Sequence, residues 1–339
     1  MKKKLILIFS ILLFVLGVSV WGCVHLGASG NIPHDEINKV IFDKLSQKEI
    51  IETPITTIVW DLRLPRVLLA AMVGAALALS GAAFQGLLRN PLADPYIVGT
   101  SAGAAVGGVI AIVFNFRGHF LGLSAISLFA FAGSVVAMYG IYRLSIIHGR
   151  VPVETFLLAG VVVGSFLWAM VSFLLTIAGK SLQEIVFWLM GSTQNTGWAG
   201  LLMLVIYLAI GIFGLMYFAH PLNVLTLGDK TAKHLGVDVE YTKIAIIIFA
   251  SLVTAAAVSL SGLIGFVGLM IPHIARIILG ADHRILFPAS ILIGAIFMVW
   301  VDTFARSAFA PREIPVGILT AILGAPFFLY LLRKYKKTL

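Results

Sequence analysis

Residues 61–108 read DLRLPRVLLAAMVGAALALSGAAFQGLLRNPLADPYIVGTSAGAAVGG, and this stretch decides the fold. After Arg63 and Arg66 it continues for about 20 residues without a charge, which is the length that spans a bilayer. The run breaks at Arg89-Asn90-Pro91 and resumes as a second apolar run rich in small residues. This pattern predicts two membrane helices joined by a tight turn.

The composition of the whole chain agrees with a membrane protein. Of its 339 residues, 60% are hydrophobic and 12% are charged, whereas a soluble domain carries about 25% charged residues. We therefore take lipid as the solvent and the bilayer as a partner. The net charge of +9 is explained by basic residues at the cytoplasmic ends of membrane helices, so no nucleic-acid partner is expected. Cys23 is the only cysteine, which excludes an internal disulfide.

The predicted fold is an all-α integral membrane protein with about ten transmembrane helices. It forms a single transmembrane domain over residues 1–339, because no linker divides the chain. The apolar runs that predict these helices fall near residues 5–26, 64–88, 97–114, 121–144, 153–178, 198–218, 243–261, 264–279, 285–304 and 315–332.

The distribution of charge predicts the orientation. With the N-terminus inside, 15 of the 24 Lys and Arg residues and 6 of the 15 Asp and Glu residues fall on the inner side. The net charge is then +9 inside and zero outside, as the positive-inside rule requires. We expect both termini in the cytoplasm of a multi-pass protein of the cell membrane. Lys2-Lys3-Lys4 and the run to Val20 also fit a cleaved signal peptide, but the run is long enough to span, and we favour a retained first helix.

Two polar segments interrupt the pattern. The inner segment 219–242 is too polar to cross the membrane, and its residues 229–235 predict a short surface helix that ends at Gly236. On the outer side, Ser181–Met190 is apolar but too short to span, so it is expected to lie in the interface or to re-enter.

Glycines at helical spacing indicate close helix contacts. Gly99 and Gly103 lie four residues apart, a spacing that lets helix backbones approach closely in lipid. Gly265 and Gly268 lie just before Pro272, where a helix is weak. Because broken helices are tolerated where they line a cavity, we interpret this segment as a bent element beside a pathway, with packing as the alternative.

Ionisable groups are almost absent from the middle of the apolar runs. Only His273 lies somewhat deeper, and we interpret it as a packing residue. A proton-driven carrier would need an embedded relay, although sodium coupling through backbone carbonyls stays open. No enzyme signature or metal-ligand spacing is present, so neither a catalytic residue nor a metal site is expected. If ATP drives transport, the ATPase is another chain.

Four blocks of sequence resemble the iron-chelate, haem and cobalamin permease family of ABC importers. They are residues 62–66 (LRLPR), residues 86–103 with their RNPLADP motif, residues 265–276 (GFVGLMIPHIAR) with Asp282-His283-Arg284, and residues 302–326. The resemblance covers nearly all of the chain after the first helix.

This resemblance implies a passive subunit of a larger machine. It implies a second permease subunit, identical or related, two ATP-binding cassette subunits and an extracytoplasmic substrate-binding protein. No cofactor is expected on this chain, because ATP binds the partner subunit. The cargo is expected to be a bulky metal chelate, with a ferric siderophore first and haem or cobalamin as alternatives. An ion-coupled secondary transporter and a membrane-embedded enzyme are the alternatives from other classes.

The resemblance also implies roles for particular residues. Short coupling helices between spans six and seven would grip the ATPase through Gly228, Asp229, Ala232, Leu235 and Gly236. Arg63, Arg66 and Arg306 would bind acidic residues of the binding protein, and Arg63 and Arg66 would project together around Pro65. The inner gate would correspond to Ser145–Pro152 and the outer gate to Ser181–Met190. The pathway or its gates would include Gly99, Gly103, Gly265, Gly268 and Pro272.

Overall fold

The computed structural model describes residues 2–27, 32–46, 53–120, 122–194 and 197–336, and these residues are nearly all helical. The longer helices are α1 (Lys2–His25), α2 (His34–Leu45), α4 (Leu64–Leu87), α5 (Thr100–Val113), α6 (Ala125–Ser145), α7 (Val153–Ile177), α9 (Gly197–Tyr217), α12 (Val239–Ser261), α13 (Val267–Leu279), α14 (His283–Ser307) and α15 (Val316–Lys336). The short elements are α3 (Pro54–Thr56), η1 (Thr57–Arg63), η2 (Pro95–Val98), β1 (His119–Phe120), β2 (Leu123–Ser124), η3 (Gly179–Ser181), α8 (Leu182–Leu189), α10 (Ala219–Leu225) and α11 (Asp229–His234).

The predicted fold class is confirmed. Each of the ten predicted apolar runs contains a helix of the structure. Among the described residues, seven helices are long and apolar enough to cross a membrane. Three further apolar helices are shorter: α5 (Thr100–Val113), α13 (Val267–Leu279) and the part Val316–Leu331 of α15. The number of crossings and the side on which the termini lie stay predictions.

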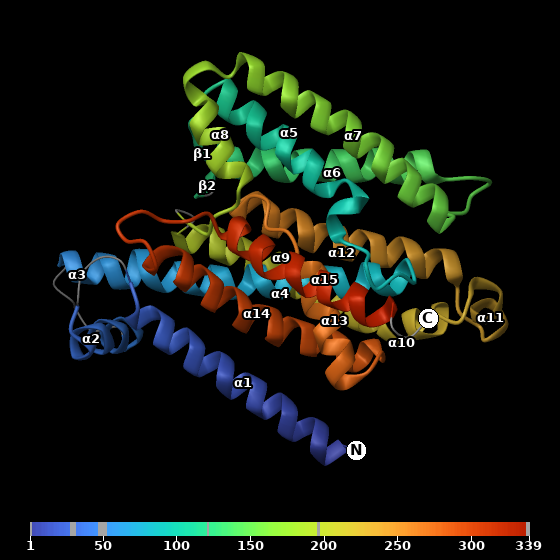
Figure 1. Ribbon diagram of the computed structural model, residues 1–339, viewed down its shortest axis with the longest axis horizontal. Coiled ribbons are helices and arrows are strands. Elements are labelled where there is room, and N and C mark those ends of the chain that lie inside the picture. The colour runs from blue at the N-terminus through green and yellow to red at the C-terminus, as the bar shows by residue number, and fades with distance from the viewer. Residues whose placement is uncertain (1, 28–31, 47–52, 121, 195–196, 337–339) are drawn as a thin grey trace.

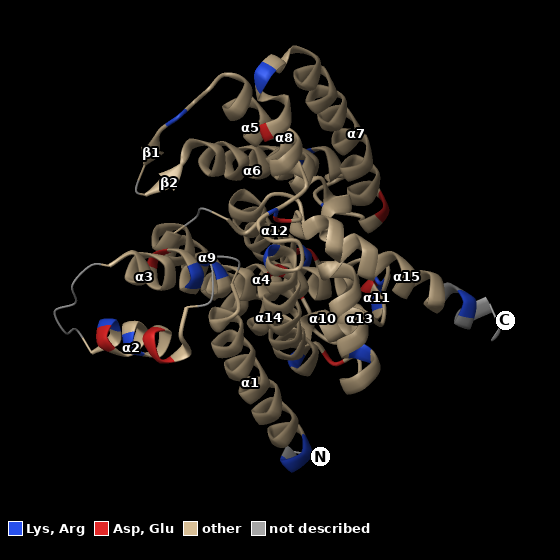
Figure 2. Cartoon of the chain, turned by 60° about the vertical axis from the view of Figure 1, so that its left-hand side comes forward, with Lys and Arg blue, Asp and Glu red and all other residues tan. Residues whose placement is uncertain are grey.

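The elements outside the spans gather at two opposite ends of the molecule. Figure 1 shows α10, α11 and the two chain ends at one end, and α2, α3 and the β1–β2 hairpin at the other. Lys and Arg mark both chain ends in Figure 2. We call the end with α10 and α11 the coupling end and the other the outer end. This arrangement agrees with an even number of crossings.

Helix α4 is the centre of the bundle. In the helical segment Pro54–Leu87, 89% of the most apolar window is buried inside the chain, against 6% for α1. Glycines permit this burial, because a Cβ at Gly74 would overlap with the backbone of Gly294 on α14, and one at Gly81 with the carbonyl of Gly268 on α13. Close backbone approach of this kind holds helices together in lipid, where the hydrophobic effect does not act between them.

The break between α12 and α13 lies against the short helix η2, inside the bundle. The chain between α12 and α13, residues 262–266, is not helical, and Phe266 has a left-handed φ of +68°. The Tyr96 hydroxyl donates to the carbonyl of Ile264 and accepts from the N–H of the same residue, both at 2.9 Å. One side chain thus pairs two backbone groups that the broken helix leaves free, as burial in an apolar bundle requires.

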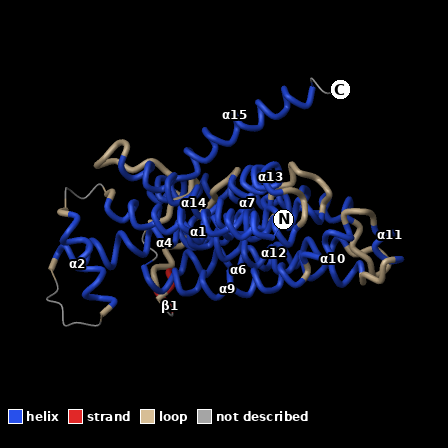
Figure 3. The backbone as a smooth tube through the Cα atoms, turned by 90° about the horizontal axis from the view of Figure 1, so that it is seen from below, coloured by secondary structure: helices blue, strands red, loops and turns tan. Residues whose placement is uncertain are grey.

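The two polar segments contain the expected helices. The predicted surface helix at 229–235 is α11, and Gly236 after it has a φ of +82°, the left-handed conformation of a glycine C-cap. The short apolar element predicted at Ser181–Met190 is α8 with the turn η3 before it. Figure 3, seen at right angles to Figure 1, shows α11 and α2 at opposite extremes and α15 extending away from the rest of the bundle.

We predict that Gly81→Ala destabilises the bundle by about 1–3 kcal/mol, because α4 and α13 must move apart to admit the methyl group. The measurement is the thermal midpoint of the purified protein in detergent. Gly140→Ala on α6 is the matched control, since a Cβ there meets no atom within 4 Å. Equal midpoints for the two variants would contradict the central contact.

Candidate functional site

The predicted coupling residues form a compact, partly exposed corner. Gly228, with a φ of +112°, directly precedes α11, and Gly236 ends it. Within α11, Ala232 is fully buried, whereas Leu235, directly after the helix, is 62% exposed. An apolar side chain held outward on a short, well-anchored helix is suited to enter a groove on another protein.

A group of charges that we call the α11 cluster anchors this helix: Arg89, Asp229, Glu240 and Lys243. The Asp229 carboxylate pairs with Arg89 in the loop after α4 and, at 2.5 Å, with Lys243 on α12. Burial alone would raise the pKa of Asp229, but the hydrogen bonds from Lys243 and Arg89 outweigh it and hold the pKa below its ordinary value. Asp229 is therefore charged at neutral pH and joins α11 to two spans.

The α11 cluster also reaches the predicted inner gate. Ile147 and Arg150 pair through their backbones across a tight turn at His148 and Gly149, which both have positive φ. The N–H of Val151, directly after this turn, donates to the Glu240 carboxylate at 2.8 Å. Glu240 lies 3.6 Å from Lys243, so the turn, α11 and α12 share one network.

A second set of contacts holds α10. The Asn223 amide donates to Asp282 at 2.6 Å and accepts from the N–H of His283 at 2.9 Å. Asp282 caps α14, and its pKa is lowered chiefly by a hydrogen bond from Arg284. Both halves of the 219–242 segment are therefore tied to membrane helices, α10 to α14 and α11 to α12.

The predicted docking arginines lie in a group at the outer end that we call the Asp302 cluster: Arg63, Arg66, Asp302, Arg306 and Glu313. Arg66 Nη2 lies 3.1 Å from Asp302 and 2.9 Å from Glu313. Arg306 pairs with Asp302 at 3.7 Å. Burial alone would raise the pKa of Glu313, but the hydrogen bonds and charges of its neighbours, Arg66 foremost, together outweigh burial and lower this pKa, so the carboxyl is charged.

Arg63 and Arg66 both lie at the outer end, but neither side chain extends into solvent. Arg63 is 4% exposed, and its Nε and Nη2 atoms have no hydrogen-bond partner among the described residues. Arg306 is equally buried and donates to the Cys23 carbonyl on α1. Asp302 pairs with Arg66 and Arg306 and holds their guanidinium groups inward, because a buried charge needs a partner. Their docking role stays a prediction.

The predicted pathway residues form two groups, one at the start of α5 and one at the break before α13. The short helix η2 links them, because Tyr96 bonds to Ile264 and a Cβ at Gly268 would overlap with Pro95. Gly99, with a φ of +80°, begins α5, and a Cβ at Gly103 would overlap with the backbone of α6, so Gly103 serves helix packing. Gly268 packs on α4, Pro272 lies inside α13, and Gly265 belongs to the break, where a Cβ would meet no atom within 4 Å. The predicted bend is present, while a pathway role for these residues stays a prediction.

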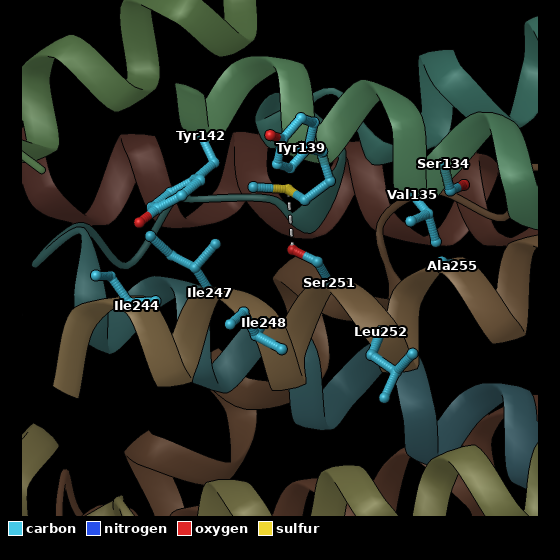
Figure 4. Close-up of a pocket in the computed structure, with 11 residues that line it drawn as sticks. Ser134, Val135, Tyr139, Tyr142, Ile244, Ile247, Ile248, Ser251, Leu252 and Ala255 are labelled. Atoms are coloured by element: carbon cyan, nitrogen blue, oxygen red, sulfur yellow. Dashed lines mark hydrogen bonds between the residues drawn. The ribbon is translucent and has the colours of Figure 1, made fainter. Parts of the chain in front are cut away.

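An apolar groove of about 330 Å³ lies between α6 and α12 (Figure 4). Isoleucine side chains of α12 face the tyrosines Tyr139 and Tyr142 of α6, and Ser251 donates to the Met138 sulfur at 3.1 Å. No charged side chain lines the groove, and none of the predicted site residues contributes to it.

The sequence pattern does not point to several residues of these networks. Asn223 and Glu240 belong to the polar segment 219–242 and carry no individual prediction, Lys243 counts only as one of the inner basic residues, and Glu313 has no predicted role. A lysine placed five residues into a helix that becomes wholly apolar was the available signal, because such a charge needs a partner. The partners themselves are distant in the sequence: Arg89 is 140 residues from Asp229, and Arg66 is 247 residues from Glu313.

We predict that Asp229→Asn loosens α11, because Lys243 and Arg89 lose their carboxylate on this helix. Hydrogen exchange at the amides of Ala232 and Leu235 should accelerate by about two- to fivefold, the size expected for a half-exposed pair. Asp238→Asn is the matched control, since it removes a charge from the same segment while asparagine still caps α12. Equal exchange rates in both variants would show that the ion pairs do not hold the helix.

Comparison with known proteins identifies the class of the chain. The model of the FecCD transport family matches residues 6–334. The cobalamin import system permease protein BtuC of Halobacterium salinarum is 46% identical over 276 residues, which are 81% of this chain and 73% of the relative. The hemin transport system permease protein HmuU of Yersinia pestis is 42% identical over 284 residues, 82% of this chain and 84% of the relative.

A solved structure agrees in fold. It is an inward-facing conformation of an ABC transporter assigned to the metal-chelate type, with a TM-score of 0.80 and 34% sequence identity, and the match covers 96% of this chain and 99% of that one. Members of this family are transport subunits and not enzymes themselves, and nothing in the comparisons supports an ion-coupled carrier. Membership implies ATPase, substrate-binding and permease partners. The chain therefore belongs to the FecCD transport family, as the multi-pass permease of an ABC importer of the metal-chelate type.

Proposed function

We propose that this chain carries a bulky metal chelate into the cytoplasm. An ATPase subunit drives the conformational change of this chain by binding α10 and α11. The α11 cluster is the observation that carries this proposal. Asp229 and Glu240 join the exposed corner around Leu235 to α12, to the loop after α4 and to the turn before α7. A displacement of α11 therefore reaches three spans through hydrogen-bonded charges rather than through a flexible linker.

A charged cleft beside α11 supports an acidic partner surface. The cleft has a volume of about 670 Å³, and its lining includes Arg150, Lys230 and Lys233. Three carboxylates also line the cleft, and each already has a partner within the chain. Asp229 pairs with Arg89 and Lys243, Asp238 accepts from the N–H of Tyr241, and Glu240 accepts from the N–H of Val151. The three basic side chains have no ion pair among the described residues. The cleft thus offers net positive charge to the ATPase, which favours steered docking.

The cargo is proposed as a complete chelate, with a ferric siderophore first and haem and cobalamin as alternatives. Among the described residues, no three His, Cys, Asp or Glu side chains form a group that could hold a metal ion. A cargo that brings its own ligands needs no such group. The names of the two relatives, one for cobalamin and one for hemin, support this breadth.

The assembly is proposed as a pair of permease subunits, identical or related, in the cytoplasmic membrane. Helices α7 and α15 support the pairing, because both expose large apolar side chains, for example Phe166 and Leu329, at more than 60%. A second copy or a related permease could cover these faces in place of lipid.

We predict that uptake requires the ATPase and the α11 cluster. Proteoliposomes should contain this chain, its ATPase and the binding protein that co-purifies with it, and the ligand held by that binding protein should be identified by mass spectrometry and supplied as cargo. Uptake should vanish with a hydrolysis-deficient ATPase, and Asp229→Asn should lower it severalfold. Glu154→Gln, which removes one exposed charge from the first turn of α7 outside the cleft, should leave uptake unchanged. Uptake without the ATPase would refute the proposed function.

We also predict that the ATPase docks on the basic cleft. The double substitution Lys230→Glu and Lys233→Glu should weaken co-purification of the ATPase by about tenfold, because repulsion replaces attraction. Lys39→Glu with Lys44→Glu reverses the same number of charges on α2 at the outer end and should leave it intact. Equal loss in both pairs would indicate a general effect of charge.

A further inference from the structure

The segment that follows α8, residues 190–194, is held by bonds to three other elements. The N–H groups of Val316 and Gly317 at the start of α15 donate to the carbonyls of Gly191 and Met190, at 3.0 and 3.1 Å. The N–H of Ser192 donates to the carbonyl of Ser261 at the end of α12, at 2.7 Å. We call residues 190–194 the outer segment.

The side chains of the outer segment share their acceptors with Arg66. The Thr193 hydroxyl donates to Asp302 at 2.5 Å, and the Gln194 amide donates to Glu313. Arg66 donates to the same two carboxylates, from Nε to Asp302 at 3.2 Å and from Nη1 to Glu313 at 3.1 Å. Whatever changes the pairing of Arg66 therefore also changes what holds the outer segment.

The two carboxylates differ in access. The Asp302 side chain is 0% exposed, whereas Glu313 is 29% and Arg66 is 14% exposed. An incoming group can therefore reach the Arg66–Glu313 pair but not the Arg66–Asp302 pair. Gln194 is itself exposed, so this part of the network lies at the surface.

The Asp302 cluster carries an excess of one positive charge. Its three arginines outnumber its two carboxylates, and among the described residues the buried Arg63 has no hydrogen-bond partner for its Nε and Nη2 atoms. A carboxylate that docks on the outer end would neutralise this excess. It would also compete with Glu313, because a guanidinium binds carboxylates through the same N–H groups.

We propose that Glu313 and Gln194 form a latch that a carboxylate of the docking protein opens. The carboxylate of the docking protein replaces that of Glu313 on Arg66, and Glu313 moves away. Gln194 then loses its hydrogen-bond acceptor, so the outer segment is held by one contact fewer. No covalent bond changes, and Arg66 exchanges one singly charged carboxylate for another. The inference rests on the proposed function, since it needs a binding protein that docks at this end.

Glu313→Gln tests the latch against Asp61→Asn. Asp61 is exposed near the same end and has no hydrogen bond or ion pair among the described residues, so both variants remove one negative charge but only Glu313 contacts Arg66. In the complete complex, Glu313→Gln should tighten the affinity for the co-purified binding protein by about fivefold or more, because the internal competitor is weakened. Asp61→Asn should change it by less than about twofold.

A second measurement reports on the outer segment itself. Ser192→Cys places a thiol there, and the native Cys23 is buried. Its reaction with a membrane-impermeant maleimide should accelerate in Glu313→Gln and in Gln194→Ala, whereas Gln194→Ala should leave the affinity for the binding protein unchanged. ATP hydrolysis without binding protein reports that each variant is folded and assembled.

The outcomes separate the two proposals. Equal affinities for Glu313→Gln and Asp61→Asn, or unchanged maleimide reactivity in both latch variants, would overturn the latch. If the binding protein fails to bind the unsubstituted complex, the proposed function fails instead.

Discussion

Lipid does not drive helices together, so this chain depends on close contact between backbones. Helix α4 makes that contact on two sides, with α14 at Gly74 and with α13 at Gly81. The same contact explains why α13 can begin in the middle of the bundle. The free backbone of the break is covered by protein, and Tyr96 pairs the two polar groups of Ile264. A soluble protein could leave such a break to water, but here it must be satisfied from within.

Charge is confined to the two ends, and at each end it connects elements that are distant in sequence. At the coupling end, Asp229 and Lys243 join a short surface helix to the spans. At the outer end, Asp302 and Glu313 bring together α4, α14 and the outer segment. Motion at either end can therefore be transmitted by rearranged polar contacts, while the apolar middle moves as packed helices.

The sequence predicts the helices well and the networks poorly, for physical reasons. Long apolar runs give α1, α4 and α12 directly, because bilayer thickness sets their length. The Gly-Pro pattern at 262–272 predicts the break, since proline and glycine weaken a helix wherever they occur. The inward direction of Arg66 could not be foreseen, because it depends on Asp302 and Glu313, more than 230 residues away. The direction of a long side chain is decided by its partners.

Helix α1 is hardly buried, although it carries two polar contacts to α14, Ser19 with Trp300 and the Cys23 carbonyl with Arg306. Ser19 and Trp300 are 281 residues apart. At about 5–20 residues per second of synthesis, α1 waits on the order of tens of seconds before its partner exists. During that time it must be stable as a solitary span, which its uniformly apolar surface allows. The order of biogenesis thus accounts for a helix that is solvated by lipid first and docked by hydrogen bonds last.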